Sequence, residues 1–245
     1  MKFFKLIFII IVSIITFAII SSHNTPTISK FNHRFYWSKE EKRLDTKLFK
    51  NRVIYVTGGS SGIGKELVEY LNPICNVSFC SGPRTPGGVD LSTEMGVRKV
   101  ISDIDEIKPD TVILNAGCHS PDIDINFLVN LSAPLRIVRH LCMHYPDTKV
   151  IYIGSRASRF YDNIIGTLNP YDNSYGCAKY MMTAIMFAQK TLSNYAVWAP
   201  PALPTSVRSK KKLSNNKQTN KKIREHAKLL GIKVLNNIDH MYWEY

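Results

Sequence analysis

The sequence has no group of cysteines or histidines with the spacing of a metal site. Its five cysteines are an odd number, and most of them fall in segments that we expect in the core, which favours reduced thiols over a disulfide framework. The seven histidines are scattered along the chain. We therefore expect no catalytic metal. No internal repeat is visible either, and 245 residues suit one globular domain.

Acidic side chains are missing from the basic run at 208–224. The chain carries 32 Lys and Arg against 19 Asp and Glu, a net charge of +13, and eight of the basic residues lie in this run. The other 24 basic residues exceed the 19 acidic ones by only five. No nucleic-acid recognition motif accompanies the run, so we do not expect nucleic acid as a partner. Attraction to anionic lipid headgroups and a solvated loop are both left open.

A long apolar run occurs at the start of the sequence. Residues 6–20 are interrupted by only two hydroxyl side chains, and the run reaches the short end of what can span a bilayer. We interpret residues 1–22 as an uncleaved single-pass membrane anchor and residues 23–50 as a juxtamembrane linker. A signal peptide cleaved at the small residues 21–22 is the alternative. The cysteine content favours a cytosolic catalytic domain.

Segments with the pattern of strands alternate with segments that have the pattern of helices. We expect strands at 52–57, 76–80, 111–115, 149–154 and 196–199, and helices at 62–72, 93–107, 127–144 and 175–192. This alternation predicts an α/β fold, a Rossmann-type doubly wound parallel sheet with helices on both faces. We place the domain at 51–207. Residues 208–245 would complete it with a helix over 219–230, ended by Gly231, and a last strand at 232–235.

A glycine-rich turn follows the first predicted strand. The β-branched residues of 52–57 run into Gly58, Gly62 and Gly64, after which a helix begins. Side chains at these glycines would keep a pyrophosphate from the backbone and would keep the helix from packing on the strand. The free N–H groups and the dipole of the helix favour phosphate. In this context the motif predicts a dinucleotide site, and a turn that binds nothing is the alternative.

Tyr175 and Lys179 are placed for proton transfer. They lie four residues apart, so on a helix their side chains share one face. A phenol with a pKa near 10 is a poor acid–base catalyst at neutral pH, and a neighbouring ammonium favours the phenolate. Ser155 follows the 149–154 strand at its carboxyl end, where open α/β sheets bind ligands. The alternatives are a Tyr-Lys pair on a solvated helix face and a serine that makes a turn.

These motifs resemble those of the short-chain dehydrogenase/reductase family over roughly residues 51–207. The matching points, in order, are Thr57-Gly-x-x-x-Gly-x-Gly64, Asp90-Leu91 after the third strand position, Asn115-Ala-Gly117, Asn130, Gly154-Ser155 and Tyr175-x-x-x-Lys179. The resemblance implies hydride transfer between a carbonyl or alcohol substrate and a nicotinamide cofactor. It also leaves a homodimer as an option.

The resemblance assigns a role to each residue of the site. Tyr175 would be the acid/base, Lys179 would serve the phenolate and the ribose, Ser155 would orient the substrate and Asn130 would support a water-linked proton relay. The cofactor would lie against Gly58, Ser60, Ser61, Gly62, Ile63, Gly64, Ser81, Arg84, Asp90, Asn115, Ala116, Gly117, Tyr175, Lys179 and Thr205.

Some segments depart from the family pattern. The 156–174 loop is longer than usual, so we expect it to bulge over the site. Residues 117–130 look too short to hold the small helix that is usual there. Pro200-Pro201 stands where the family has Pro-Gly, and Pro201 offers no N–H.

The end of the second predicted strand indicates the cofactor. NAD-selective sites place a carboxylate there to hold the ribose 2′-hydroxyl. Here the strand runs into Ser81-Gly-Pro-Arg84, with no carboxylate and one guanidinium that could pair with a 2′-phosphate. We therefore expect NADP, with NAD as the alternative. If Arg84 is only a surface loop residue, this preference has no basis.

Taken with the motifs, these observations predict an NADP-preferring oxidoreductase that interconverts a carbonyl and an alcohol. A membrane tether would make a lipophilic substrate a reasonable class. The alternative is a catalytically weak nucleotide-binding scaffold or regulator, which the altered 200–218 segment favours. A nucleic-acid-binding protein would rest on the basic run alone.

Overall fold

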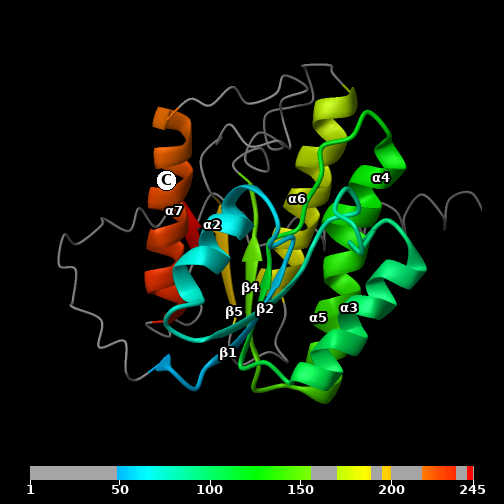
Figure 1. The fold of residues 1–245 in the computed structure, drawn as a ribbon. Coiled ribbons are helices and arrows are strands. Elements are labelled where there is room, and N and C mark those ends of the chain that lie inside the picture. Colours follow the sequence, from blue (N-terminus) through cyan, green and yellow to red (C-terminus); the bar gives the residue numbers. More distant parts are fainter. Residues whose placement is uncertain (1–48, 156–169, 189–194, 200–216, 236–241, 245) are drawn as a thin grey trace, which may run out of the picture. The chain divides into compact units, whose positions relative to one another are not determined.

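A parallel β-sheet forms the centre of the protein (Figure 1). The structure, a computed structural model, describes residues 49–155, 170–188, 195–199, 217–235 and 242–244. In these residues six parallel strands are hydrogen-bonded in the order β2-β1-β3-β4-β5-β6. They are β1 (Val53–Thr57), β2 (Asn76–Cys80), β3 (Thr111–Leu114), β4 (Lys149–Ile153), β5 (Tyr195–Ala199) and β6 (Tyr242–Glu244).

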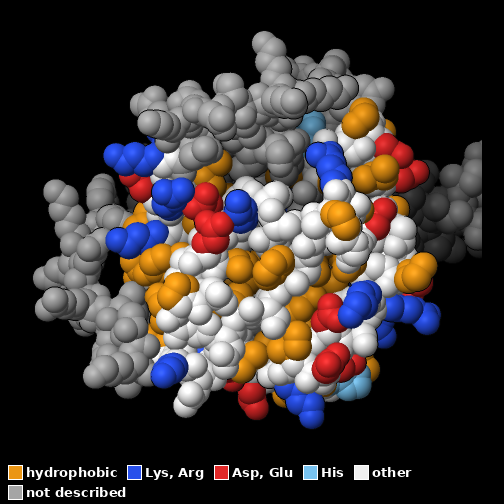
Figure 2. Space-filling model, viewed as in Figure 1, with side chains coloured by type: hydrophobic (Ala, Val, Ile, Leu, Met, Phe, Trp, Pro, Cys, Tyr) orange, Lys and Arg blue, Asp and Glu red, His pale blue; other side chains and the backbone are white. Residues whose placement is uncertain are grey.

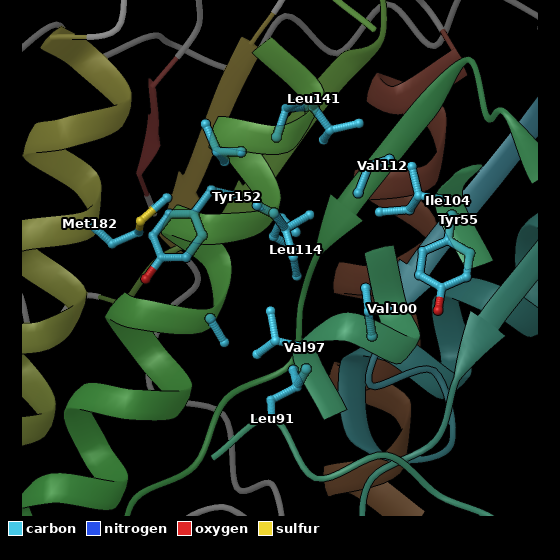
Figure 3. Packing of buried hydrophobic residues seen from close by; sticks show 14 of the residues in the cluster. Tyr55, Leu91, Val97, Val100, Ile104, Val112, Leu114, Leu141, Tyr152 and Met182 are labelled. Carbon is cyan, nitrogen blue, oxygen red and sulfur yellow. The ribbon is translucent and has the colours of Figure 1, made fainter. Parts of the chain in front are cut away.

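Helices cover both faces of this sheet. They are α2 (Gly62–Leu71), α3 (Glu94–Ile107), α4 (Ile123–Phe127), the π-helical turn η3 (Leu128–Ser132), α5 (Ala133–His144), α6 (Pro170–Ala188) and α7 (Lys217–Leu235). Because side chains alternate along a strand, β1 sends Ile54 and Val56 to the cluster under α2 and α7, whereas Tyr55 joins the cluster under α3, α5 and α6 (Figures 1 and 3). The fold is therefore a three-layer α/β/α arrangement.

The predicted doubly wound sheet is confirmed. The expected strands 52–57, 76–80, 111–115, 149–154 and 196–199 agree with β1 to β5 to within a residue at each end. Chain order reverses between β1 and β3, because β1 connects to β2 on one side and the chain then returns to β3 on the other. The carboxyl ends of β1 and β3 therefore flank the switch point, where open α/β sheets bind ligands.

The expected end of the fold was wrong. Helix α7 continues through Gly231 and takes in residues 232–235, which we expected to form a strand. Gly231 does not end the helix; it lies against Tyr70 of α2 so closely that a Cβ would overlap the ring, which accounts for a glycine inside the helix. Val234 and Leu235 are buried with α2 and the sheet at helical spacing from Ala227. The last strand is β6, which pairs with β5.

Two helices differ from their expected bounds. The helix expected at 127–144 is interrupted, because η3 separates α4 from α5. The short helix α4 also corrects the expectation that residues 117–130 lack a small helix. Helix α6 begins at Pro170 rather than at 175, and proline suits the first turn because its missing N–H would be unpaired there.

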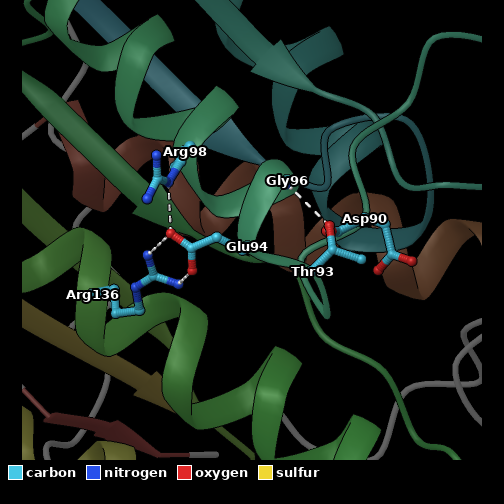
Figure 4. A network of polar contacts seen from close by, with 6 residues as sticks. All are labelled: Asp90, Thr93, Glu94, Gly96, Arg98 and Arg136. Atoms are coloured by element: carbon cyan, nitrogen blue, oxygen red, sulfur yellow. Dashed lines mark hydrogen bonds and ion pairs between the residues drawn. The ribbon is translucent and has the colours of Figure 1, made fainter.

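No strand forms at the third strand position among the described residues. Residues 81–93 instead lead from β2 to α3 as a loop, closed by a hydrogen bond from the Val89 amide to the Ser81 carbonyl (2.8 Å). Thr93 then caps α3 by accepting a hydrogen bond from the Gly96 amide (3.1 Å; Figure 4). Hydrogen bonds from Arg136 of α5 and from Arg98 hold the pKa of Glu94 at about 2, so this carboxylate joins the two helices at neutral pH.

Charges of both signs are interspersed over the face shown in Figure 2. In the described part of the basic run, Arg224 pairs with Glu66 of α2 (3.0 Å) and Lys221 pairs with Glu225 (3.9 Å). Residues 208–216 lie outside the described residues. The run itself contains no acidic residue, but acidic residues of α2 and of the next turn of α7 pair with part of it.

The predicted anchor, residues 1–22, and most of the linker at 23–50 lie outside the described residues. Among the helices that are described, none has the length and apolar character needed to cross a bilayer.

Candidate active site

The glycine-rich turn lies directly after β1. Gly58 adopts a left-handed conformation (φ 69°), and a Cβ there would come within 3.0 Å of the Ala116 Cα. A Cβ at Gly64 would overlap the Gly58 carbonyl. Ser61 precedes α2 in an extended conformation, and its side chain makes no capping hydrogen bond. The turn therefore brings the start of α2 against the ends of β1 and β3 with its first N–H groups uncapped by Ser61.

Side chains from the ends of β1 and β3 hold this turn in place. The Asn115 amide donates to the carbonyls of Thr57 (3.0 Å) and Gly58 (3.1 Å). In return, the Thr57 hydroxyl accepts a hydrogen bond from the Ala116 amide (3.0 Å). The predicted cofactor residues of these two strands thus meet at the switch point of the sheet.

The loop after β2 borders the same turn. The Gly82 amide donates to the Ser60 hydroxyl (3.4 Å), so the predicted residue Ser60 is hydrogen-bonded to the residue that follows the predicted Ser81. Arg84 is exposed in this loop. Asp90 lies at its end, where its carboxylate accepts hydrogen bonds from the amide (2.9 Å) and the hydroxyl (2.7 Å) of Ser92.

Two of the predicted residues, Asn130 and Lys179, lie close to a third, Gly117. A Cβ on Gly117 would lie 3.0 Å from Asn130 Oδ1 and 3.2 Å from Lys179 Nζ. Asn130 is fully buried in η3, and its side chain brackets Cys118 by accepting from the Cys118 amide (3.2 Å) and donating to its carbonyl (2.8 Å). A π-turn displaces residues from the regular helical register and is frequent at functional sites.

Lys179 is a buried cation, with only 3% of its surface exposed. Its ammonium donates to the Ile153 carbonyl at the end of β4 (2.9 Å). Burial lowers the pKa of Lys179 from 10.5 to about 8, and the Cys118 thiol opposes that change. The side chain is therefore still largely protonated at neutral pH and loses its charge as the pH rises above about 8.

Tyr175 and Ser155 lie near this cation. Tyr175 is half-buried one helical turn before Lys179, and its ring meets the His119 ring edge to face at a centroid distance of 5.2 Å. Ser155 is half-buried two residues after the end of β4, which supplies the carbonyl that holds Lys179. The arrangement places a phenol, an ammonium and a hydroxyl at the carboxyl end of the sheet.

The sequence interpretation missed a second buried asparagine. Asn126 brackets Ser120 as Asn130 brackets Cys118, by accepting from the Ser120 amide (2.8 Å) and donating to its carbonyl (2.8 Å). Its amide also donates to the Ser174 hydroxyl (2.8 Å), which precedes Tyr175. The two asparagines thus fix the residues on both sides of His119. Their four-residue spacing in the sequence was the signal that could have identified the pair.

Other parts of the predicted site lie outside the described residues. These are Thr205, with the Pro200-Pro201 segment before it, and most of the long loop, residues 156–169.

Known proteins resemble this chain in part of its sequence and in its fold. No family model matches the sequence. An uncharacterized oxidoreductase of Saccharomyces cerevisiae, TDA5, is 28% identical over 148 residues, which cover 50% of this chain and 43% of that protein. This chain thus spans less than half the length of that relative.

Solved structures share the fold. A 3-oxoacyl-(acyl-carrier-protein) reductase from Agrobacterium tumefaciens with NADP bound has a TM-score of 0.60 and 15% identity, over 82% of this chain and 93% of that one. A short-chain dehydrogenase from Burkholderia cenocepacia in complex with NADP has a TM-score of 0.59 and 17% identity, over 80% and 89%. A 3-alpha-hydroxysteroid dehydrogenase from Pseudomonas with NADH has a TM-score of 0.58 and 18% identity, over 73% and 89%. The chain has the Rossmann-type fold of nicotinamide-dependent dehydrogenases and reductases.

Proposed function

We propose that the protein is a short-chain oxidoreductase that interconverts a carbonyl and an alcohol, with Tyr175 as the acid/base. The observation that carries this proposal is the buried Lys179 ammonium. It lies one helical turn from Tyr175 and against Gly117, in the segment after β3 that borders the glycine-rich turn. Burying a cation costs free energy, and residues with strongly perturbed pKa values concentrate at functional sites.

The residues present fit a nicotinamide dinucleotide. Gly58, Gly64 and Gly117 each lie where a Cβ would approach or overlap a neighbouring segment, so these positions need glycine for the close packing of strand end and helix start that a dinucleotide turn uses. The start of α2 and Asn115 would border the phosphates, and Lys179 would donate to the ribose. The bound cofactor would supply or accept the hydride at the substrate carbon.

The proton would follow the residues already described. In the reductive direction the Tyr175 phenol would give its proton to the oxygen of the substrate, which Ser155 would hold by a hydrogen bond. The Lys179 ammonium would stabilise the phenolate that is left. Asn130, held by Cys118 on one side, would support the path by which the phenol regains a proton.

Measurement of NADPH oxidation by the full-length protein against a panel of aldehydes, ketones, steroids and long-chain carbonyls tests this proposal. Turnover of a panel member that requires Tyr175 supports it. Tight binding of NADPH without turnover of any carbonyl would favour the scaffold or regulator instead. That alternative rests on the altered 200–218 segment, most of which lies outside the described residues.

We further propose a preference for NADP. Arg84 lies exposed in the loop after β2, and no acidic residue lies at the end of that strand. Arg84→Ala is expected to weaken NADPH binding by about tenfold to a hundredfold, the range of a lost charge-assisted hydrogen bond, and to leave NADH binding nearly unchanged. Calorimetry with both cofactors checks this, and Arg139→Ala, on the exposed face of α5, is the matched control. Tighter binding of NADH than of NADPH by the unaltered protein would overturn the preference.

We also keep the membrane anchor as a proposal, since residues 1–22 are apolar enough to insert. Carbonate extraction of membranes from expressing cells is expected to leave the full-length protein in the pellet. Release into the supernatant, with a mature amino terminus near His23, would show a cleaved signal and remove the argument for a lipophilic substrate. The cytosolic placement of the domain and the homodimer also remain predictions.

A further inference from the structure

Tyr152 is a buried core residue that contacts two of the proposed catalytic residues, Lys179 and Asn130. It is the penultimate residue of β4, is 1% exposed and packs beside Met182 of α6 (Figure 3). Its side chain has two chemically distinct parts, an aromatic face and a hydroxyl. Each part contacts a different residue of the proposed site.

The face of the ring lies against the buried cation. Lys179 Nζ is 4.9 Å from the centroid of the Tyr152 ring, within the range of a cation–π contact. The described structure gives this ammonium one backbone acceptor, the Ile153 carbonyl. An aromatic face attracts a desolvated cation more strongly than an exposed one, so the ring offsets part of the cost of burying Lys179.

The hydroxyl holds the backbone of η3. It donates to the main-chain carbonyl of Asn130 (3.3 Å). In a regular helix that carbonyl would accept from the amide of residue 134, but Pro134 has no N–H. Tyr152 therefore supplies a donor to a carbonyl that the proline deprives of its usual partner.

We propose that Tyr152 is a positioning residue of the active site, whose ring face stabilises the charged form of Lys179 and whose hydroxyl fixes the turn that carries Asn130. This inference rests on the proposed function for its catalytic meaning. Its physical content, the control of Lys179 by an aromatic ring, does not depend on the substrate. Tyr152 acts through Lys179 and Asn130 and needs no contact with the substrate.

Among the described residues, few other groups act on the charge of Lys179. Burial lowers its pKa, and from the loop after β3 the Cys118 thiol raises it. On α6 itself, Tyr175 lies one turn away, and its charge acts on the Tyr152 phenol, whose pKa burial raises well above 10. Removal of the Tyr152 ring on β4 should therefore change the pKa of Lys179 measurably.

The test is a titration of Lys179 by carbon-13 NMR of lysine side chains in the full-length protein. The signal is assigned by its loss in Lys179→Met. Tyr152→Leu removes the ring face and is expected to lower the pKa of Lys179 by about half to one and a half pH units. Tyr152→Phe keeps the face and is expected to leave that pKa close to its original value. Tyr55→Leu, which removes the other fully buried tyrosine of the same cluster, is the matched control and should not move it.

Tyr152→Leu is a large change in the core, so a series of equal shape accompanies it. Phenylalanine and its mono- and difluorinated forms at position 152 progressively reduce the negative electrostatic potential of the ring face. The pKa of Lys179 should therefore fall along the series. A flat series, or an equal change in Tyr55→Leu, would overturn the proposal. Because the titration needs no substrate, a moving pKa without any reductase activity would refute the proposed function and leave this inference standing.

Discussion

Replacing Tyr175 by phenylalanine is expected to lower turnover by about 10²- to 10⁴-fold, the range for loss of a general acid–base group. The substitution keeps the ring, and so keeps its edge-to-face contact with His119 at 5.2 Å. It removes only the proton that would pass to the substrate oxygen. NADPH affinity should change little, because the glycine-rich turn proposed to bind the phosphates lies between β1 and α2, away from Tyr175 in the sequence. Steady-state kinetics and calorimetry with a verified substrate measure both quantities.

Tyr180→Phe is the matched control for this experiment. It removes a phenol from the same helix, five residues further along and outside the proposed site. Turnover should survive this change. Full activity in Tyr175→Phe would mean that the acid/base has been misassigned, even if the protein proves to be a reductase.

Lys179→Met is expected to abolish turnover and, in the protein without cofactor, to stabilise the fold at pH 7. Burial lowers the pKa of Lys179 from 10.5 to about 8, so at pH 7 the buried charge costs on the order of 3 kcal/mol. Methionine removes that cost but leaves the Ile153 carbonyl without its donor, which costs about 1–3 kcal/mol. The expected net gain is about 1 kcal/mol, measured by urea unfolding.

The pH dependence gives this prediction a second check. Between about pH 8 and 10.5 the unfolded chain binds the lysine proton that the folded chain has lost, so the stability of the unaltered protein rises with pH across that window. The methionine variant lacks this rise, and its advantage should shrink and then reverse. If the variant is less stable than the unaltered protein at pH 7, burying the charged form of Lys179 does not cost the free energy that its lowered pKa implies.

The parts of the fold that the sequence predicted well depend on local patterns. Strands β1 and β4 are β-branched runs that end at a glycine, and the turn from Gly58 to Gly64 has a spacing that only a close backbone approach explains. For the same reason Tyr175 and Lys179 could be assigned to one helical face before the helix was seen. Local periodicity is enough to place such residues.

The parts that were missed depend on contacts between distant segments. Gly231 looked like a helix end, but its partner is Tyr70, far away in the sequence, and such packing leaves no local pattern. The role of Asn126 likewise requires Ser120 and Ser174 to be brought together by α4 and α6. The interruption at η3 was also invisible, although Pro134 marks a lost backbone donor within the expected helix.

The π-turn at Leu128–Ser132 affects how this protein can be compared with its relatives. Its backbone bond runs from the Ala133 amide to the Leu128 carbonyl, five residues back, so the turn holds one residue more than an α-helical turn. A relative with an uninterrupted helix here would need a one-residue gap inside the turn. A gapless alignment that matches Asn126 would then misplace the buried face of α5 by about 100° around the helix. Alignments should therefore be made separately for the residues before and after the turn at 128–132, and the position that matches Asn130 inside the turn should be assigned by structure.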